Sequence, residues 1–250
     1  MNGVTLIVPY YRNPLMLRRQ LEEMNQYPSG LQVIIVDDGS PEPAEPIVKE
    51  MASAELRDRL RLYRILVDIP WNREQARNIG AREAVTDWIV QVDIDHILPV
   101  DCVPVLLAYP ADDNHWYRFP RWRVGKADAT RRKDRILPEC EFGEILPHMD
   151  SYLVRRDVFW EAGGLDEDFA GVLGGGSEFL QRLEQVARED LLPKHIHLHV
   201  YTRHAIADAS DLHCDRDRQP GKVIMRRKTV KAKMRGKPSN LLRLPWERVL

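Results

Sequence analysis

Two carboxylates and an imidazole lie close together in the segment Asp93-Ile94-Asp95-His96. The segment follows an apolar run, residues 88–92, that is typical of a buried strand. Because side chains alternate along a strand, Asp93 and Asp95 are expected on one face, where the strand opens into a loop. Mg²⁺ and Mn²⁺ prefer carboxylate oxygens and keep positions open for phosphates, so the segment suits a nucleotide diphosphate. Taken alone, the pattern is more typical of a solvated acidic turn. The neighbouring motifs therefore decide between a metal site and such a turn.

Strand and helix patterns alternate through the residues that precede this segment. Strands are predicted at residues 4–9, 31–36, 60–66 and 88–92, and helices at residues 13–24, 40–54 and 72–85. This alternation is typical of a parallel sheet covered by helices on both faces, with ligands at the carboxyl ends of the strands. Polar clusters follow three strand ends, at residues 9–13, 37–40 and 93–96, and should therefore meet at one edge of the sheet. No G-x-G-x-x-G follows the first strand, which argues against a dinucleotide-dependent dehydrogenase.

The pattern loosens in the second half of the chain. Residues 110–148 are predicted to form loops and an edge hairpin, followed by a strand at 151–155 and a helical turn at 157–161. An amphipathic helix is predicted at residues 177–188. Residues 194–201 alternate strictly, which places three histidines on one face of a strand: His195, His197 and His199. A half-exposed strand explains this alternation without a metal ion.

Composition places the chain among ordinary globular proteins. Its 250 residues are 44% hydrophobic and 30% charged, enough for one sizeable α/β domain or a domain with an appendage. No apolar stretch is long enough to cross a bilayer, and the first residues enter a strand pattern without a basic leader, so a cytoplasmic location is predicted. The three cysteines, Cys102, Cys140 and Cys214, are odd in number and lack C-x-x-C spacing, and are predicted to be reduced thiols.

Charge is distributed unevenly along the chain. Residues 221–250 contain ten basic residues and one acid, Glu247, which gives this segment a charge of about +9 and leaves about −10 for the rest of a chain of net charge −1. Such a basic tail favours contact with phosphates, nucleic acid or a membrane surface. A solvated terminus without a partner is the alternative.

The motifs together resemble the inverting family 2 glycosyltransferases with the GT-A fold, which use a nucleotide-diphosphate sugar. The resemblance lies in VPYYRN after the first strand, VDDGS after the second, WNREQARNIGAREA, DIDH and EAGGLDEDF, over roughly residues 3–183. It implies an α/β, mostly parallel GT-A (Rossmann-like) sheet flanked by helices, with a basic C-terminal extension. Residues 1–98 would bind the nucleotide sugar, 99–220 of the same domain would bind the acceptor, and 221–250 would form the tail.

The resemblance also implies roles for individual residues on the donor side. Asp38 would accept a hydrogen bond from the base, Pro9 with Tyr10 or Tyr11 would line the base pocket, and Arg77 would offset the diphosphate charge. Turn capping for Asp38, core packing for one tyrosine and a surface ion pair for Arg77 are the alternatives.

The metal motif and its third ligand follow from the same resemblance. Asp93 would contact the ribose or nucleotide, and Asp95 would bind Mn²⁺ or Mg²⁺, which neutralises the leaving diphosphate. His213 is the first choice for a third ligand and His204 the second, although a single histidine is more often structural.

The chain departs from the family in GVLGGGSEFLQRL, residues 171–183. Gly175 and Gly176 stand where the family commonly has an acidic pair, one of which is the catalytic base. Glu178 is the best remaining candidate base, with Asp166 and Asp168 in reserve. A helix acid without a catalytic role explains Glu178 equally well.

Two classes of function follow. The leading hypothesis is a metal-dependent glycosyltransferase that moves a sugar from a nucleotide-diphosphate sugar to a hydroxyl of a saccharide, a lipid-linked glycan or modified nucleic acid. The alternative is a nucleic-acid or anionic-surface binding protein with a degenerate transferase domain. The two combine if the tail docks an active enzyme on DNA or peripherally on a membrane.

Overall fold

The computed structural model describes residues 3–126, 142–209, 217–232, 238 and 240–250. Its first half alternates strands and helices as predicted. The elements are β1 (Val4–Tyr10), α1 (Pro14–Met24), β2 (Leu31–Asp37), α2 (Glu45–Met51), α3 (Ala54–Arg57), β3 (Leu60–Ile65), α4 (Arg73–Glu83) and β4 (Trp88–Gln91).

The second half adds shorter elements. They are β5 (His96–Ile97), α5 (Cys102–Ala108), β6 (His115–Arg118), β7 (Arg121–Val124), β8 (Phe142–Ile145), β9 (Tyr152–Arg155), α6 (Arg156–Glu161), the 3₁₀ helix η1 (Glu167–Phe169), α7 (Gly175–Leu183), β10 (Arg188–Leu191), β11 (Leu198–Tyr201), α8 (Gln219–Ala232) and β12 (Trp246–Arg248).

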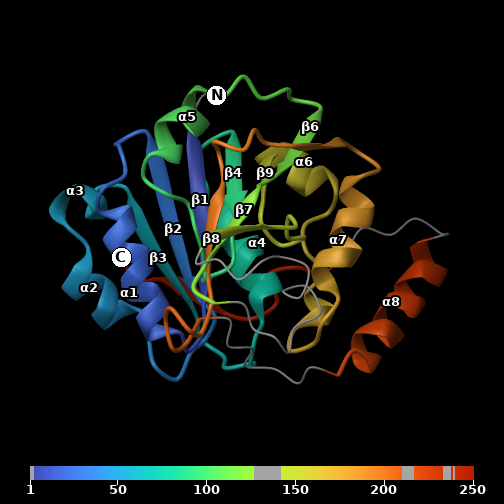
Figure 1. Ribbon diagram of the computed structural model, residues 1–250. Coiled ribbons are helices and arrows are strands. Elements are labelled where there is room, and N and C mark those ends of the chain that lie inside the picture. The colour runs from blue at the N-terminus through green and yellow to red at the C-terminus, as the bar shows by residue number, and fades with distance from the viewer. Residues whose placement is uncertain (1–2, 127–141, 210–216, 233–237, 239) are drawn as a thin grey trace.

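A mixed eight-stranded sheet forms the centre of the molecule, in the order β10-β6-β9-β4-β1-β2-β3-β12 (Figure 1). Strands β1 to β4 are mutually parallel where they pair, as the sequence predicted, and β9 and β12 run antiparallel to their neighbours β4 and β3. A second sheet, β5-β11-β7-β8, lies beside it. The parallel centre follows from runs such as Val4–Tyr10, in which every residue is buried.

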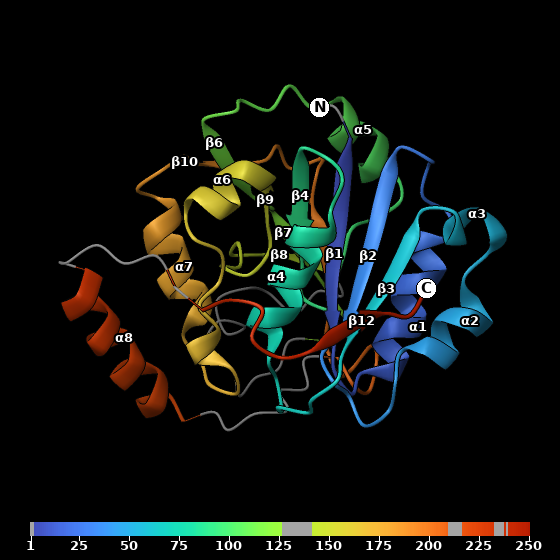
Figure 2. The ribbon, with the colours of Figure 1, turned by 180° about the vertical axis from the view of Figure 1, so that it is seen from behind.

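Helices cover both faces of the large sheet, and each face has its own apolar core. On one face, Leu6 and Val8 pack with residues of α1, α2 and α5. On the other, Ile7 and Val36 pack with residues of α4, α6 and α7. Figures 1 and 2 show these helices on opposite sides of the strands. Alternate side chains of one strand therefore supply both cores.

Helix α1 begins at Pro14, as predicted, but one predicted cap and one predicted helix start are wrong. Asn13 makes no side-chain cap on α1; instead Asp208 accepts hydrogen bonds from the backbone N–H groups of Leu15 (2.7 Å) and Met16 (3.0 Å). The helix predicted from residue 40 begins at Glu45. Residues 38–44 form a turn instead, because the turn's backbone bonds to Asp37 rather than continuing as a helix.

Residues 110–148 contain more structure than the predicted loops and edge hairpin. Strands β7 and β8 pair antiparallel, but β7 is an inner strand of the second sheet, and β6 belongs to the large sheet. The buried side chains of Trp116 and Phe119 explain why this aromatic segment folds inward. In residues 194–201 only the last four form a strand, β11, although the predicted alternation of exposed and buried side chains is present.

The C-terminal residues add the last strand of the large sheet. Helix α8 lies outside α7 at one end of the molecule, and β12 pairs with the edge of β3 (Figure 2). Trp246 packs edge-on against Tyr63 of β3, with ring centroids 5.6 Å apart. Among the described residues, no helix is long and apolar enough to span a membrane. Cys102 is a buried free thiol, whereas Cys140 and Cys214 lie outside the described residues.

Candidate active site

The three polar clusters meet at one edge of the large sheet, at the carboxyl ends of β1, β2 and β4. Tyr10 and Asp37 are partners in the β1–β2 register, and the backbone N–H of Asp38 donates to the carbonyl of Tyr10 at 2.9 Å. On the other side of β1, the backbone N–H of Val92 donates to the carbonyl of Ile7 at 3.2 Å. The predicted convergence of strand ends is therefore present.

Asp37 and Asp38 divide two tasks between them. Asp37 accepts hydrogen bonds from the backbone N–H groups of Ser40 (2.8 Å) and Ala44 (2.9 Å), so it is Asp37 that closes the turn. Asp38 is equally buried, and its Oδ1 has no hydrogen-bond partner among the described residues. Burial, assisted by the nearby Glu74 carboxylate, raises the pKa of Asp38 well above its usual value. A buried oxygen of this kind requires a partner that the described part of the chain does not supply.

Tyr10, the last residue of β1, and Tyr11, which follows it, are both buried but differ in their contacts. Tyr10 belongs to the core, where its hydroxyl donates to the Glu42 carbonyl at 3.0 Å. The Tyr11 hydroxyl donates to Asp68 at 2.8 Å, which holds its ring at the sheet edge. Burial is the main reason that the pKa of each tyrosine is raised to about 12. Pro9, also buried, lies in β1 itself.

The acidic motif forms a turn rather than the end of a strand. Strand β4 ends at Gln91, and the backbone N–H of His96 donates to the carbonyl of Asp93 at 3.0 Å. The prediction that Asp93 and Asp95 share one face of a strand is therefore wrong, because the chain turns between them. Both side chains remain partly exposed, 20% for Asp93 and 15% for Asp95.

Asp93 is held by two cationic or polar partners. Its Oδ1 accepts a hydrogen bond from Nη2 of Arg77 at 2.6 Å, and its Oδ2 lies 3.2 Å from Nδ1 of His148. Burial opposes ionisation of Asp93, but Arg77 and His148 outweigh it and hold the pKa well below the usual range. Asp93 is consequently an ionised, oriented carboxylate.

Arg77 lies beneath the site rather than at its surface. The residue has no solvent exposure, and its Nη1 also donates to the carbonyl of Asp150 at 2.6 Å. The alternative of a surface ion pair is therefore wrong. Arg77 connects the turn that contains Asp93 to the loop that precedes β9.

His96 lies at the centre of a possible cation cluster but is poorly suited to it. Ligand atoms of Asp93, His96 and His148 all lie within 4.8 Å of one another. However, Nδ1 of His96 shares a 2.5 Å hydrogen bond with Ser151, and its Nε2 lies 3.3 Å from Nη1 of Arg121. Burial and the Arg121 guanidinium lower the pKa of His96 well below its usual value. A cation would therefore meet the carboxylates of this turn more favourably than His96.

The two histidines predicted as third metal ligands are not part of this cluster as described. His213 lies outside the described residues, and His204 is exposed in the turns that follow β11. The faces of His197 and His199 do meet, with Nε2 atoms 3.3 Å apart, but no acidic residue completes a cluster among the described residues.

All three residues predicted as catalytic bases form ion pairs. Glu178 binds Arg182 through two hydrogen bonds of 2.8 and 2.7 Å within α7. The ammonium group of Lys228 in α8 lies 2.5 Å from Asp166 and 2.6 Å from Asp168. These carboxylates therefore have structural partners of opposite charge.

Four charged or polar side chains near Asp93 are missing from the sequence-based prediction: His148, Asp150, Arg73 and Glu74. Arg73 donates from Nη1 to Asp150 at 2.5 Å and from Nε to Glu74 at 3.2 Å. The His-x-Asp spacing directly before a predicted strand, and the charged start of the predicted helix after Asn72, are the signals that could have indicated them.

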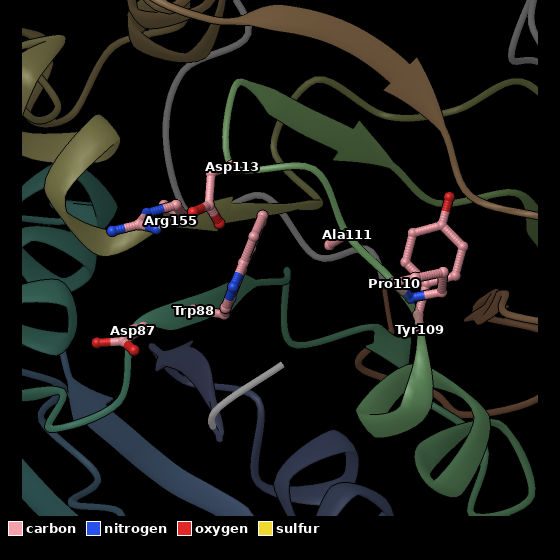
Figure 3. A pocket seen from close by; sticks show the side chains of 7 residues that line it. All are labelled: Asp87, Trp88, Tyr109, Pro110, Ala111, Asp113 and Arg155. Carbon is pink, nitrogen blue, oxygen red and sulfur yellow. Dashed lines mark ion pairs between the residues drawn. The ribbon is translucent and has the colours of Figure 1, made fainter.

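A surface hollow lies away from this site. A cavity of about 220 Å³ is lined by seven residues at the amino end of β4 (Figure 3): Asp87, Trp88, Tyr109, Pro110, Ala111, Asp113 and Arg155. Asp113 and Arg155 form a 2.6 Å ion pair at its rim. Trp88 begins the strand whose other end leads to Asp93, so this hollow and the polar clusters lie at opposite ends of β4.

The amino-acid sequence is similar to those of known glycosyltransferases. The family model described as Glycosyl transferase family 2 matches residues 5–172, which include every strand end described above. A curated relative, the undecaprenyl-phosphate 4-deoxy-4-formamido-L-arabinose transferase of Pectobacterium carotovorum subsp. carotovorum (strain PC1), is 26% identical over 113 residues. The match covers 44% of this chain but only 34% of that protein.

Solved structures share the fold at low sequence identity. S. aureus TarS 1-349 has a TM-score of 0.62 and 14% identity over 80% of this chain and 61% of its own. The mannosyltransferase PcManGT from Pyrobaculum calidifontis, in complex with GDP-Man and Mn²⁺, has a TM-score of 0.58 and 18% identity over 94% of this chain and 65% of its own. The architecture is therefore the GT-A fold, as predicted, and this chain spans less than two thirds of each of these proteins.

Proposed function

Because this chain belongs to glycosyl transferase family 2, we propose that it transfers a sugar from a nucleotide-diphosphate sugar to an acceptor hydroxyl, with a divalent cation and with inversion at the sugar. One observation carries the proposal most directly. The buried, unpaired Oδ1 of Asp38 lies at the same sheet edge as the ionised Asp93. This edge therefore offers an acceptor for a base N–H next to a carboxylate for the ribose or cation.

The donor would lie across the ends of β1, β2 and β4. Asp38 would accept a hydrogen bond from the base, while Pro9 and Tyr11 would line the base pocket. Tyr10 supports this pocket from within the core. Arg77 would act on the diphosphate only through Asp93, since its guanidinium is fully buried.

A cation would be held mainly by Asp95. Both oxygens of Asp93 already have partners in Arg77 and His148, which leaves Asp93 suited to orienting the ribose. When bound, Mn²⁺ or Mg²⁺ would neutralise negative charge that develops on the leaving diphosphate. His213 stays a proposed third ligand. The Mn²⁺ and GDP-Man found in PcManGT support a cation and a nucleotide sugar for this fold.

Binding measurements test the proposal directly. Calorimetric titrations with UDP-glucose, UDP-N-acetylglucosamine, GDP-mannose and dTDP-glucose, each with and without Mn²⁺, should show at least one donor whose affinity increases with the cation. Asp95→Asn should abolish that increase, whereas Asp101→Asn, a substitution at an exposed position in the segment after β5, should leave it unchanged. If no donor binds more tightly with Mn²⁺, the proposal of a metal-dependent transfer is wrong.

The basic tail supports a second role for the same protein. Lys222, Arg226 and Arg227 are exposed on α8, whereas Lys228 on that helix faces Asp166. The exposed cations would dock the protein on an anionic surface, such as a membrane carrying a lipid-phosphate acceptor or a nucleic acid. Affinity for vesicles with anionic lipid, and for duplex DNA, should fall as salt rises. Charge reversal at 222, 226 and 227 should remove this affinity; unchanged binding would exclude a docking role for α8.

A further inference from the structure

Two glycines at the start of α7 lie directly against two carboxylates. A Cβ atom added to Gly175 would stand 2.4 Å from Oε1 of Glu74, and one added to Gly176 would stand 2.0 Å from Oδ1 of Asp150. Both distances are too short for any real side chain while these carboxylates keep their places. Glycines at 175 and 176 therefore leave the room that the carboxyl groups of Glu74 and Asp150 occupy.

A single arginine fixes both carboxylates. Arg73 donates to Asp150 at 2.5 Å and to Glu74 at 3.2 Å, and its guanidinium stacks on the Trp71 ring, 4.5 Å from the ring centroid. Asp150 and Glu74 are both buried, so neither carboxyl group is hydrated by bulk water. The amino end of the nine-residue helix α7 adds a favourable dipole at the same place. The group is rigid because each member is held by another.

Asp150 is separated from the acidic turn by one imidazole ring. Nδ1 of His148 lies 3.8 Å from Oδ2 of Asp150 and 3.2 Å from Oδ2 of Asp93. Arg77 spans the same gap from below, contacting Asp93 and the carbonyl of Asp150. Arg182 binds both carboxylate oxygens of Glu178, whereas Arg73 binds Asp150 at Oδ2. Compared with Glu178, Asp150 has the more suitable position, because its carboxylate lies beside Asp93.

We propose that Asp150 is the catalytic base, in place of an acid at position 176. This rests on the proposed function, in which the acceptor oxygen forms a bond to the anomeric carbon while the carbon–oxygen bond to the diphosphate breaks. The electron pair of the broken bond remains on the diphosphate, and the acceptor proton passes to the Asp150 carboxylate. Glu74 is a positioning residue, which acts by holding Arg73 against Asp150.

If Asp150 is the base, a carboxylate at position 176 should be able to replace it. Asp150→Asn keeps the size of the side chain and removes the proton acceptor. Gly176→Asp alone should clash with Asp150, whereas Asp150→Gly combined with Gly176→Asp places a carboxylate back at 176 and removes the clash. Asp157→Asn is the matched control, since Asp157 is exposed and pairs with Arg155 at the opposite end of β9.

The assay follows release of nucleoside diphosphate from the tightest-binding donor of the calorimetric panel, with Mn²⁺ and water as the acceptor. Asp150→Asn should lower kcat by on the order of 10²-fold, the usual contribution of a general base, with donor Kd within about threefold. The exchange variant, which combines Asp150→Gly with Gly176→Asp, should have a kcat at least tenfold above that of Asp150→Gly alone. Asp157→Asn should have the kcat of the unmodified protein.

Different results separate this proposal from the proposed function. Absence of donor binding by the unmodified protein would contradict the proposed function itself. Normal donor binding with kcat of Asp150→Asn within threefold of the unmodified protein would overturn the assignment of the base. If Asp150→Asn is too unstable to assay, the exchange variant decides: a folded exchange variant that binds donor but stays as slow as Asp150→Gly also overturns it.

Discussion

The carboxylate of Asp93 is bound at 2.6 Å by Arg77, a residue with no contact with solvent. A charge at the surface of the site is thus stabilised by one buried beneath it. Removal of the arginine would leave Asp93 with His148 as its remaining ion-pair partner among the described residues, and would remove a donor from the carbonyl of Asp150. The same side chain therefore matters for both folding and donor binding.

Arg77→Gln should lower the free energy of unfolding by about 3 kcal/mol, because one partner of a buried ion pair is removed. Arg82→Gln, on the exposed side of the same helix, should change it by less than about 0.5 kcal/mol. Urea denaturation of both variants measures the difference. Equal effects of the two substitutions would show that the Arg77–Asp93 pair contributes nothing specific.

Asp38→Asn should have opposite effects on stability and on nucleotide binding. Burial raises the pKa of Asp38, so the native state retains this proton to higher pH than the unfolded chain, and ionisation weakens folding as pH rises. The variant lacks this cost, and its stability relative to the unmodified protein should grow with pH in denaturation curves. Its affinity for the nucleotide should fall about tenfold, because an amide group replaces the buried carboxyl group that accepts the hydrogen bond of the base. Unchanged nucleotide affinity in calorimetry would remove Asp38 from the base pocket.

Glu74→Gln should remove a pH dependence that lies between pH 4.5 and about 7. Burial is the main cause that raises the pKa of Glu74 from 4.5 to about 7, against the opposing effect of Arg73. Across this window the native state binds the proton that the unfolded state has lost, so stability falls as pH rises, by up to about 3 kcal/mol. Unfolding free energies of both proteins at several pH values should diverge in this window. Parallel curves would contradict a protonated Glu74 in the native state.

The strand ends could be found from sequence because they depend on local pattern. Almost wholly apolar runs such as residues 4–9 predicted a parallel sheet, and Asp38 and Asp93 follow such runs. Residues brought in by distant segments could not be found in this way. Arg73 and Asp150 are 77 positions apart, and antiparallel pairing of β9 with β4 brings them together. Strand β12 has three residues, too few for a periodic pattern.

Lys228→Met should loosen the attachment of α8 to the acidic residues of η1 and its amino end. The ammonium group contacts both Asp166 and Asp168, and it is 26% exposed, so a stabilisation of only up to about 1 kcal/mol is expected. The variant should be cleaved by trypsin near α8 faster than the unmodified protein. Lys222→Met, on an exposed part of the same helix, provides the control. Identical cleavage rates would show that Lys228 does not hold the helix.

Strand β12 gives the C-terminal residues a protective role. It hydrogen-bonds to the outer side of β3, so the N–H and C=O groups of β3 on that side are already paired. Without residues 246–250, β3 would become an unpaired sheet edge, able to join the same edge of a second molecule. The last residues thus keep the β3 edge from pairing with a second molecule, independently of any part that the basic segment before them plays in binding.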